Sequence, residues 1–205
     1  MVNNLKAVFQ EVDIPVNYLK NYCLYITDLL SKLDYAAIND VINCFCRARN
    51  DGSTIYFIGN GGSAATASHF SQDLGEIGRK AGKSHFRTLS LTDNVSFITA
   101  MGNDYGYDSI FTGQMSNLFK KSDVLVAISA SGNSKNIVEA VKLAKELKGI
   151  TIGLAGFDGG ELARICDHVI HVKTSKGEYG PVEDIHLMID HMITSYLTWK
   201  DLSGL

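Results

Sequence analysis

Apolar positions in the first quarter of the chain recur at the three- and four-residue spacing of amphipathic helices. They are Leu19, Tyr22, Cys23, Ile26, Leu29, Leu30 and Leu33, followed by Ile38, Val41, Ile42 and Phe45. Asp51-Gly52 then supplies a helix stop and a turn. The pattern predicts helices from residue 1 to about residue 50.

After residue 52 the pattern changes, and short apolar runs rich in β-branched residues alternate with helical stretches. The runs are 54–58, 86–91, 123–128, 150–155 and 167–172, and a last helix is expected to open at Gly180-Pro181 and end near Trp199. Strands that alternate with long helices form βαβ units, whose parallel sheet is covered on both faces. The sequence therefore predicts an α/β fold, a three-layer α-β-α sandwich with a five-stranded parallel sheet plus N-terminal helices. Residues 1–205 are expected to form one domain, with helices 1–50 packing on it or on another subunit.

Composition and charge narrow the function classes. The chain has 205 residues, a net charge of −3 and no basic stripe, so nucleic acid is not expected as a partner. Its longest apolar runs are too short to span a membrane, and its first residues do not resemble a secretory signal. The four cysteines, at positions 23, 44, 46 and 166, do not have metal-site or redox spacing. They indicate reduced thiols in a cytoplasmic protein.

Two loops that follow predicted strands are suited to bind an anion. Gly59-Asn60-Gly61-Gly62-Ser63 precedes a helix, and Ser129-Ala130-Ser131-Gly132-Asn133-Ser134 offers three hydroxyl groups at a strand-to-helix turn. Glycine lets the backbone approach a ligand, and helix N-termini favour anions. The alternative is that the serines only cap the helix. Two such loops in one sheet favour a phosphorylated ligand.

Two helices carry candidate acid, base or metal-ligating groups. His69 and Asp73 are four residues apart and so share one helix face, where they could equally form an ordinary surface pair. The last helix carries Glu183, Asp184, His186, Asp190 and His191. These charges could equally cap the helix or lie on a solvated face.

Six segments together resemble the SIS (sugar isomerase) domain family, and within it the phosphoheptose isomerase branch. They are Gly59-Asn-Gly-Gly-Ser-Ala64, Ser68-His-Phe-Ser-Gln-Asp73, Gly102-Asn-Asp-Tyr-Gly-Tyr107, Ser129-Ala-Ser-Gly-Asn-Ser134, Gly156-x-x-Gly-Gly160 and Glu183-Asp-Ile-His186. The resemblance covers nearly the whole chain and implies a flavodoxin-like SIS fold. It also implies a cytoplasmic homotetramer that acts on a phosphosugar in heptose biosynthesis, for lipopolysaccharide or capsule precursors.

The resemblance assigns roles to individual residues. It implies Asp73 and His191 as catalytic, and His69, Asp73, Glu183 and His191 as ligands of one Zn²⁺ per subunit. The implied substrate-binding residues are Asn60, Gly61, Gly62, Ser63, Asp73, Asp93, Asn94, Ser129, Ala130, Ser131, Ser134 and Glu183. A sugar-contacting Asp of the family aligns with Asn94, one place past Asp93, so the two share that assignment.

Three positions depart from the family pattern. Asp73 is one methylene shorter than the usual Glu, Glu183 replaces a Gln, and Pro181-Val182 stands where an Arg is usual. Aspartate, glutamate and histidine all bind zinc. Glu183 and His191 are eight residues apart, however, so a helix separates them by about 12 Å of rise. Either the helix start is irregular or one site combines residues of two chains.

The implied activity is aldose–ketose isomerisation through an enediol, most directly of sedoheptulose 7-phosphate to D-glycero-D-manno-heptose 7-phosphate. Two alternatives stay open. One is a non-catalytic SIS tetramer that binds a replication-initiation protein, which the presence of His69 and His191 disfavours. The other is an isomerase or epimerase for a different phosphosugar.

Overall fold

The computed structural model describes residues 4–10, 14–79 and 81–204. The elements, in chain order, are α1 (Asn4–Gln10), α2 (Pro15–Ser31), α3 (Tyr35–Asp51), β1 (Thr54–Gly59), α4 (Gly62–Glu76), β2 (Arg87–Ser90), α5 (Val95–Tyr105), the 3-10 helix η1 (Tyr107–Ser109), α6 (Thr112–Leu118), β3 (Val124–Ser129), α7 (Lys135–Glu146), β4 (Ile150–Ala155), α8 (Leu162–Ile165), β5 (His168–His171) and α9 (Tyr179–Ser203). Residues 1–3 and 11–13, which the sequence pattern predicted to be part of the N-terminal helices, lie outside the described residues.

The five strands form one parallel sheet in the order β2-β1-β3-β4-β5. The sequence prediction of a five-stranded parallel sheet within a three-layer α/β fold is confirmed. The strand order reverses between β1 and β3, because β2 is added on one side of β1 and β3 on the other. In open parallel sheets ligands bind at such a switch point, beyond the carboxyl ends of the strands.

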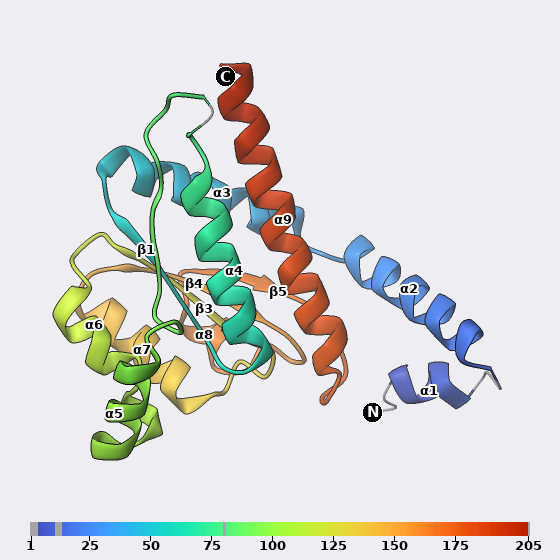
Figure 1. The fold of residues 1–205 in the computed structure, drawn as a ribbon. Helices are drawn as coiled ribbons and strands as arrows, with labels where there is room; N and C mark the ends of the chain where they lie inside the picture. Colours follow the sequence, from blue (N-terminus) through green and yellow to red (C-terminus); the bar gives the residue numbers. More distant parts are fainter. Residues whose placement is uncertain (1–3, 11–13, 80, 205) are drawn as a thin grey trace.

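Each face of the sheet has its own apolar core, because successive strand residues point to opposite faces. Ile55 and Phe57 of β1 join the core formed with α3, α4 and α9. Tyr56 and Ile58 join the core formed with α6, α7 and α8. Figure 1 shows α4 and α9 side by side along one face, running in the same direction. These two helices position the site described below.

The N-terminal helices attach to the start of α9, while α2 extends away from the sheet (Figure 1). The buried Glu178 carboxylate accepts hydrogen bonds from the Tyr25 hydroxyl at 2.6 Å and from the Asn4 backbone N–H at 2.5 Å. Tyr22 donates its hydroxyl hydrogen to Asp184 at 2.5 Å. The start of α9 is therefore held by contacts from both α1 and α2.

Several predicted boundaries shift. Helix α9 begins at Tyr179 with Glu178 as its N-cap residue, one residue before the predicted opening at Gly180-Pro181. The region between β2 and β3 is divided into α5, η1 and α6, with Gly106 at positive φ between the first two. The strands differ from the predicted runs by no more than one residue at each end, and β4 matches exactly. Gly52 ends α3 in the left-handed conformation that Asp51-Gly52 predicted.

Candidate active site

A polar pocket of about 150 Å³ lies at the switch point, between the ends of β1 and β3. We call it the serine pocket. Its lining residues are Asn60, Ser63, Ile128, Ser129, Ala130, Ser131, Ser134, Tyr179 and Glu183. The structure thus brings together the two loops that the sequence singled out, although they are about seventy residues apart.

Three hydroxyl groups gather in this pocket. The Ser129 Oγ atom lies 3.4 Å from Ser131 Oγ and 3.3 Å from Ser134 Oγ. Ser134 occupies the N-cap position of α7, yet its side chain makes no capping hydrogen bond. The Ser134 side chain therefore does not act as a helix cap, which was the alternative to phosphate binding. Hydroxyl groups that converge beside a helix N-terminus form a neutral site suited to a phosphate.

Asn60 is held in one orientation beside the serines. Its amide exchanges two hydrogen bonds of 2.9 Å with the amide of the buried Asn136. Its Oδ1 atom also accepts a hydrogen bond from the Tyr107 hydroxyl at 2.9 Å. Because both halves of the amide are engaged, its rotation would break these bonds.

Helix α9 contributes Tyr179 and Glu183 to the wall of the serine pocket. The Glu183 carboxylate lies against the backbone of Gly62: a Cβ atom built on Gly62 would be 2.3 Å from Glu183 Oε2. Burial, and then the neighbouring Asp184 carboxylate, raise the pKa of Glu183. Because Gly62 has no Cβ atom, the Glu183 carboxylate can lie beside it at the pocket.

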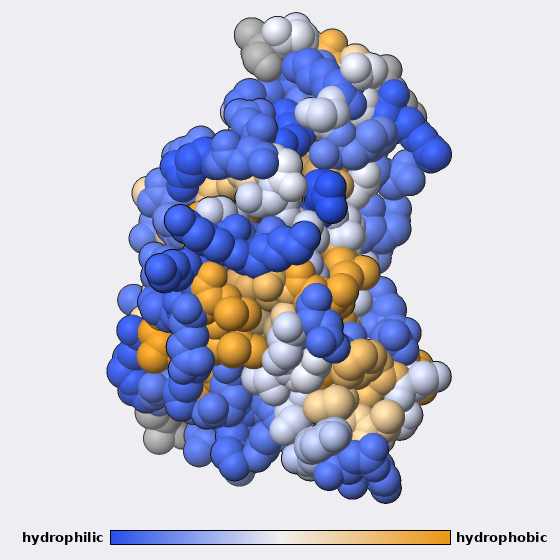
Figure 2. Space-filling model, turned by 90° about the vertical axis from the view of Figure 1, so that its left-hand side faces the viewer, coloured by the Kyte–Doolittle hydropathy of each residue, from blue (hydrophilic) through white to orange (hydrophobic). Residues whose placement is uncertain are grey.

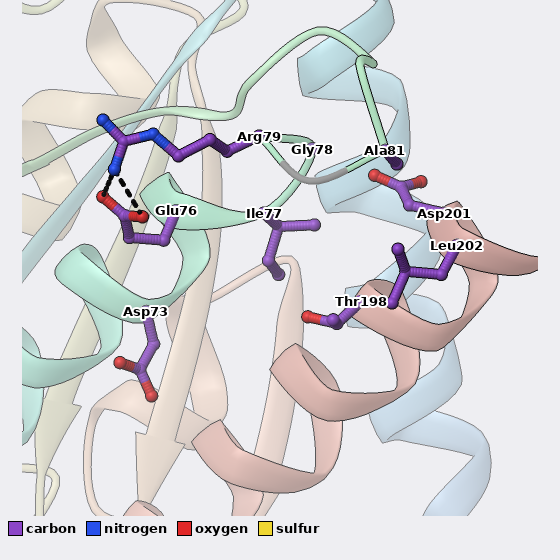
Figure 3. A pocket seen from close by; sticks show the side chains of 9 residues that line it. All are labelled: Asp73, Glu76, Ile77, Gly78, Arg79, Ala81, Thr198, Asp201 and Leu202. Atoms are coloured by element: carbon purple, nitrogen blue, oxygen red, sulfur yellow. Dashed lines mark hydrogen bonds and ion pairs between the residues drawn. The ribbon is translucent and has the colours of Figure 1, made fainter.

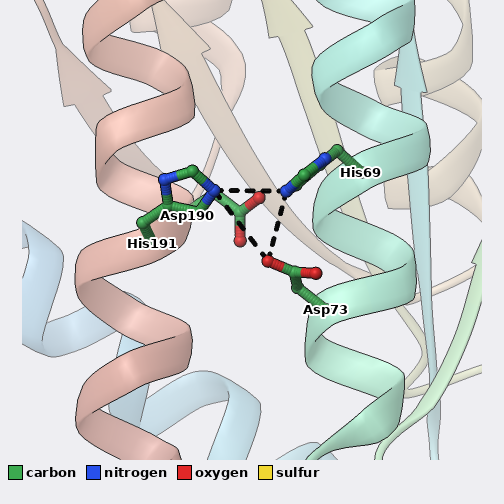
Figure 4. A group of neighbouring side chains, drawn as sticks. All are labelled: His69, Asp73, Asp190 and His191. Atoms are coloured by element: carbon green, nitrogen blue, oxygen red, sulfur yellow. Dashed lines mark hydrogen bonds and ion pairs between the residues drawn. The ribbon is translucent and has the colours of Figure 1, made fainter.

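A second group of side chains lies farther along α4 and α9, and we call it the His–Asp cluster. Its members are His69 and Asp73 of α4 and Asp190 and His191 of α9. Figure 4 shows all four side chains directed into the space between the two helices. The Nε2 atoms of His69 and His191 lie 3.1 Å apart. Asp73 Oδ2 lies 3.3 Å from His69 Nε2 and 4.0 Å from His191 Nε2.

These separations fit a metal site. Zinc bonds of about 2.1 Å at tetrahedral angles place ligand atoms about 3.4 Å from one another. One potential ligand atom from each of the four residues lies within 4.8 Å of the other three. Imidazole and carboxylate are donors that zinc accepts. The arrangement is thus compatible with one divalent cation held between α4 and α9.

Asp190 and His186 are completely buried on the inner face of α9, and the carboxylate of Asp190 and both ring nitrogens of His186 have no hydrogen-bond partner. The reading of these charges as caps or a solvated face is wrong for both residues. Burial, and then the Asp73 carboxylate, raise the pKa of Asp190 to about 7. Burial lowers the pKa of His186 to about 4. Sequence reasoning missed Asp190 as a neighbour of His69; its position between Ile189 and Ile193 indicates that the side chain is buried but not which residues it meets.

A groove opens from the cluster along α4 and α9. Asp73, Glu76, His191 and Thr198 line the part nearest the cluster. It continues into a pocket of about 210 Å³ that also includes Ile77, Gly78, Arg79, Ala81, Asp201 and Leu202 (Figure 3). Asp73 lines both parts, so its side chain is reachable from solvent.

The remaining predicted site residues lie elsewhere. Asn94 caps α5 by accepting a hydrogen bond from the Phe97 backbone N–H at 3.0 Å, and Asp93 accepts one from the Thr92 hydroxyl at 3.1 Å. Neither residue lines the serine pocket. Glu183 is not among the residues of the described part that form the His–Asp cluster. Helix α9 is continuous from Tyr179 to Ser203, so an irregular helix start does not bring Glu183 to His191.

Comparison with known proteins identifies the family. The family model of the SIS domain matches residues 21–156. The chain belongs to the SIS domain family. It is 41% identical over 144 residues to a phosphoheptose isomerase of Aliarcobacter butzleri, covering 70% of this chain and 74% of that protein. It is 35% identical over 179 residues to a phosphoheptose isomerase of Akkermansia muciniphila, covering 86% and 93%.

Solved structures agree with this SIS assignment. The phosphoheptose isomerase of Neisseria gonorrhoeae superposes with a TM-score of 0.79 at 30% identity, covering 89% of this chain and 96% of that one. That of Francisella tularensis superposes with a TM-score of 0.81 at 26% identity, covering 92% and 100%. The similarity therefore extends well beyond the residues that the family model matches. Within the described ranges, no helix of this SIS protein has the length and hydrophobicity required to cross a membrane.

Proposed function

We propose that this SIS protein is a phosphoheptose isomerase that converts sedoheptulose 7-phosphate to D-glycero-D-manno-heptose 7-phosphate. The observation that carries the proposal is that the serine pocket and the His–Asp cluster lie along the same two helices. A phosphate site and an acid–base site are what a phosphosugar isomerase requires. The relatives named phosphoheptose isomerase, at 35–41% identity over most of the chain, support the substrate class.

The phosphate of the substrate is assigned to the serine pocket. Ser63, Ser129, Ser131 and Ser134 offer hydroxyl groups there, and α4 and α7 begin beside it. In this proposal Asn60, Gly61, Gly62 and Glu183 contact the sugar next to the phosphate. Binding at this end fixes the reacting carbons and so contributes to the rate as well as to affinity.

Proton transfer between C1 and C2 is assigned to the His–Asp cluster. Asp73 acts as the base that removes the proton from C1 while His191 protonates the C2 carbonyl oxygen, which gives the enediol; His191 then takes the proton from the O1 hydroxyl as Asp73 returns its proton to C2. The two groups are 4.0 Å apart across the space between α4 and α9. Asp73 also lines the groove, so a substrate carbon can reach its carboxylate from that side.

A divalent cation, with zinc the candidate, completes the proposed site at one per chain. His69, Asp73 and His191 would hold it, and their spacing supports this set. The resemblance also implied Glu183, which the cluster does not include. When bound, the cation supplies a Lewis acid that polarises the substrate carbonyl.

We further propose a homotetramer in which residues 1–205 form one SIS domain. Large apolar side chains are exposed on α2 at Leu19 and Leu24 and on α9 at Tyr196 and Trp199. Figure 2 shows a further apolar band across an otherwise polar face. Exposed apolar surface of this kind is typical of protein interfaces.

All four cysteines are unpaired, which supports a reducing cytoplasm as the compartment. The setting that we propose there is the synthesis of heptose precursors.

The test is incubation of the purified protein with sedoheptulose 7-phosphate and a panel of shorter ketose phosphates, with and without zinc, followed by NMR of the products. We expect a heptose 7-phosphate as the main product. Asp73→Asn is expected to abolish turnover and to leave phosphosugar binding intact. Binding of the sugars without turnover would favour the non-catalytic tetramer, and turnover of a shorter ketose phosphate alone would assign a different phosphosugar.

A further inference from the structure

The Asp190 carboxylate lacks a partner that its burial requires. The side chain is completely buried, and neither oxygen accepts a hydrogen bond. No Lys or Arg among the described residues forms an ion pair with it. Removing a carboxylate from water costs several kcal/mol unless a positive charge or hydrogen-bond donors compensate. A cation bound beside Asp190 would offset this cost.

The position of the carboxylate indicates where that cation would lie. One Asp190 oxygen lies within 4.8 Å of the donor atoms of His69, Asp73 and His191. Adjacent residues on a helix normally point in different directions. Asp190 nevertheless reaches the cluster from the buried side, while His191 reaches it from the exposed side (Figure 4). One of the Asp190 oxygens thus lies close enough to the other three donor atoms to share an ion with them.

We propose that Asp190 is the fourth protein ligand of the divalent cation and takes the place expected of Glu183. This inference rests on the cation site of the proposed function. The donor set is then two imidazoles and two carboxylates, which neutralises a dication between α4 and α9. Four protein ligands do not exclude a substrate oxygen, because zinc can become five-coordinate.

The assignment also separates two roles. Glu183 is held at the serine pocket against Gly62 and is left free to contact the sugar. Asp190 is held at the cluster, about two helical turns farther along α9. One chain then contains a complete ligand set, and no carboxylate from a second chain is needed.

The experiment compares cation binding by two isosteric variants, Asp190→Asn and Glu183→Gln. Protein freed of metal is titrated with Zn²⁺ by calorimetry and with Co²⁺ by visible absorption, which reports the ligand set directly. We expect one ion per chain for the unmodified protein. Asp190→Asn should weaken affinity by at least about tenfold and change the Co²⁺ spectrum. Glu183→Gln should leave both within about twofold, because no ligand is lost.

The outcomes distinguish this inference from the proposed function. If the unmodified protein binds an ion and Asp190→Asn binds it equally well with the same spectrum, Asp190 is not a ligand. A loss of affinity in Glu183→Gln alone would also overturn the assignment. If no ion binds to any variant while heptose phosphate is still isomerised, the cation is absent from the mechanism and this inference fails with it. Metal-free Asp190→Asn should unfold at the same or a higher temperature than the unmodified protein, because it removes an unpaired buried carboxylate.

Discussion

The Glu183 carboxylate occupies the space beside Gly62 that the Cβ atom of any other residue would need. Gly62→Ala should therefore displace Glu183 from the serine pocket. The atom displaced is the end of a flexible side chain, so we expect little change in the unfolding temperature. If Glu183 no longer contacts the sugar, one hydrogen bond to a charged group is lost, which corresponds to about 1.5–3 kcal/mol. We therefore expect kcat/KM to fall by at least about tenfold.

Steady-state kinetics and thermal unfolding measure the two effects of Gly62→Ala. Gly102→Ala in α5 is the matched control, since its new methyl would meet only Ile110 at an ordinary 3.7 Å. Unchanged kcat/KM in Gly62→Ala would show that the position of Glu183 does not matter for the reaction.

The serine hydroxyls should bind inorganic phosphate. Ser134→Ala removes a hydroxyl that makes no capping bond to α7, so the free energy of unfolding should change by less than about 0.5 kcal/mol. Phosphate affinity should fall several-fold, as measured by calorimetry.

Asp34→Ala is the control for Ser134→Ala, because it should lower stability without affecting phosphate binding. The Asp34 side chain caps α3 by accepting hydrogen bonds from Ala36 and Ala37, so its loss should cost about 1 kcal/mol of stability. Phosphate affinity should stay unchanged in that variant. Equal phosphate binding by Ser134→Ala and the unmodified protein would argue against the serine pocket as the phosphate site.

Buried and exposed ion pairs should differ in their contribution to stability. Asp201 is almost completely buried and accepts two hydrogen bonds from Arg49, at 2.7 and 3.1 Å, which joins the end of α9 to α3. Asp201→Asn leaves the Arg49 charge without its partner and should destabilise the protein by about 3 kcal/mol in urea unfolding. Asp28→Asn breaks an exposed pair with Lys32 and should cost less than about 1 kcal/mol. Equal losses would contradict the structural difference between the pairs.

His186 should make the stability of the metal-free protein fall in acid. Burial lowers its folded-state pKa to about 4 from an ordinary 6.5. The unfolded chain therefore binds a proton between these values while the folded chain does not, and the contribution of His186 to stability falls as the pH drops below about 6.5. The full difference approaches about 3 kcal/mol near pH 4.

His186→Leu should remove this effect of pH. Compared with the unmodified protein, it should gain about 1 kcal/mol per pH unit below pH 6.5 and differ little above pH 7. His85→Leu is the exposed control. The raised pKa of Asp190 acts in the opposite direction in every variant, so only the difference between proteins is diagnostic. Parallel stability curves for His186→Leu and the unmodified protein would contradict the prediction.

Much of the fold could be predicted because apolar runs such as 150–155 are buried on both sides and can only be central strands. The serine pocket could also be predicted, since each loop directly follows a strand and parallel strands end at one edge. The place of Asp190 could not be predicted in the same way. A carboxylate among isoleucines on a helix has no local signal for its partner, because that partner is set by how α9 packs on α4. The sequence pattern likewise did not show that 92–119 is divided into α5, η1 and α6, with Gly106 at positive φ between the first two.

The continuity of α9 has a consequence for substrate length. A single continuous helix extends from Glu183 at the proposed phosphate site to His191 at the proposed proton-transfer site, about 12 Å farther along its axis. The backbone itself therefore works as a ruler, and no loop movement can bring the two ends together. An extended seven-carbon sugar phosphate matches such a span better than a phosphosugar two or three carbons shorter. Discrimination against shorter sugars thus needs no dedicated excluding side chain.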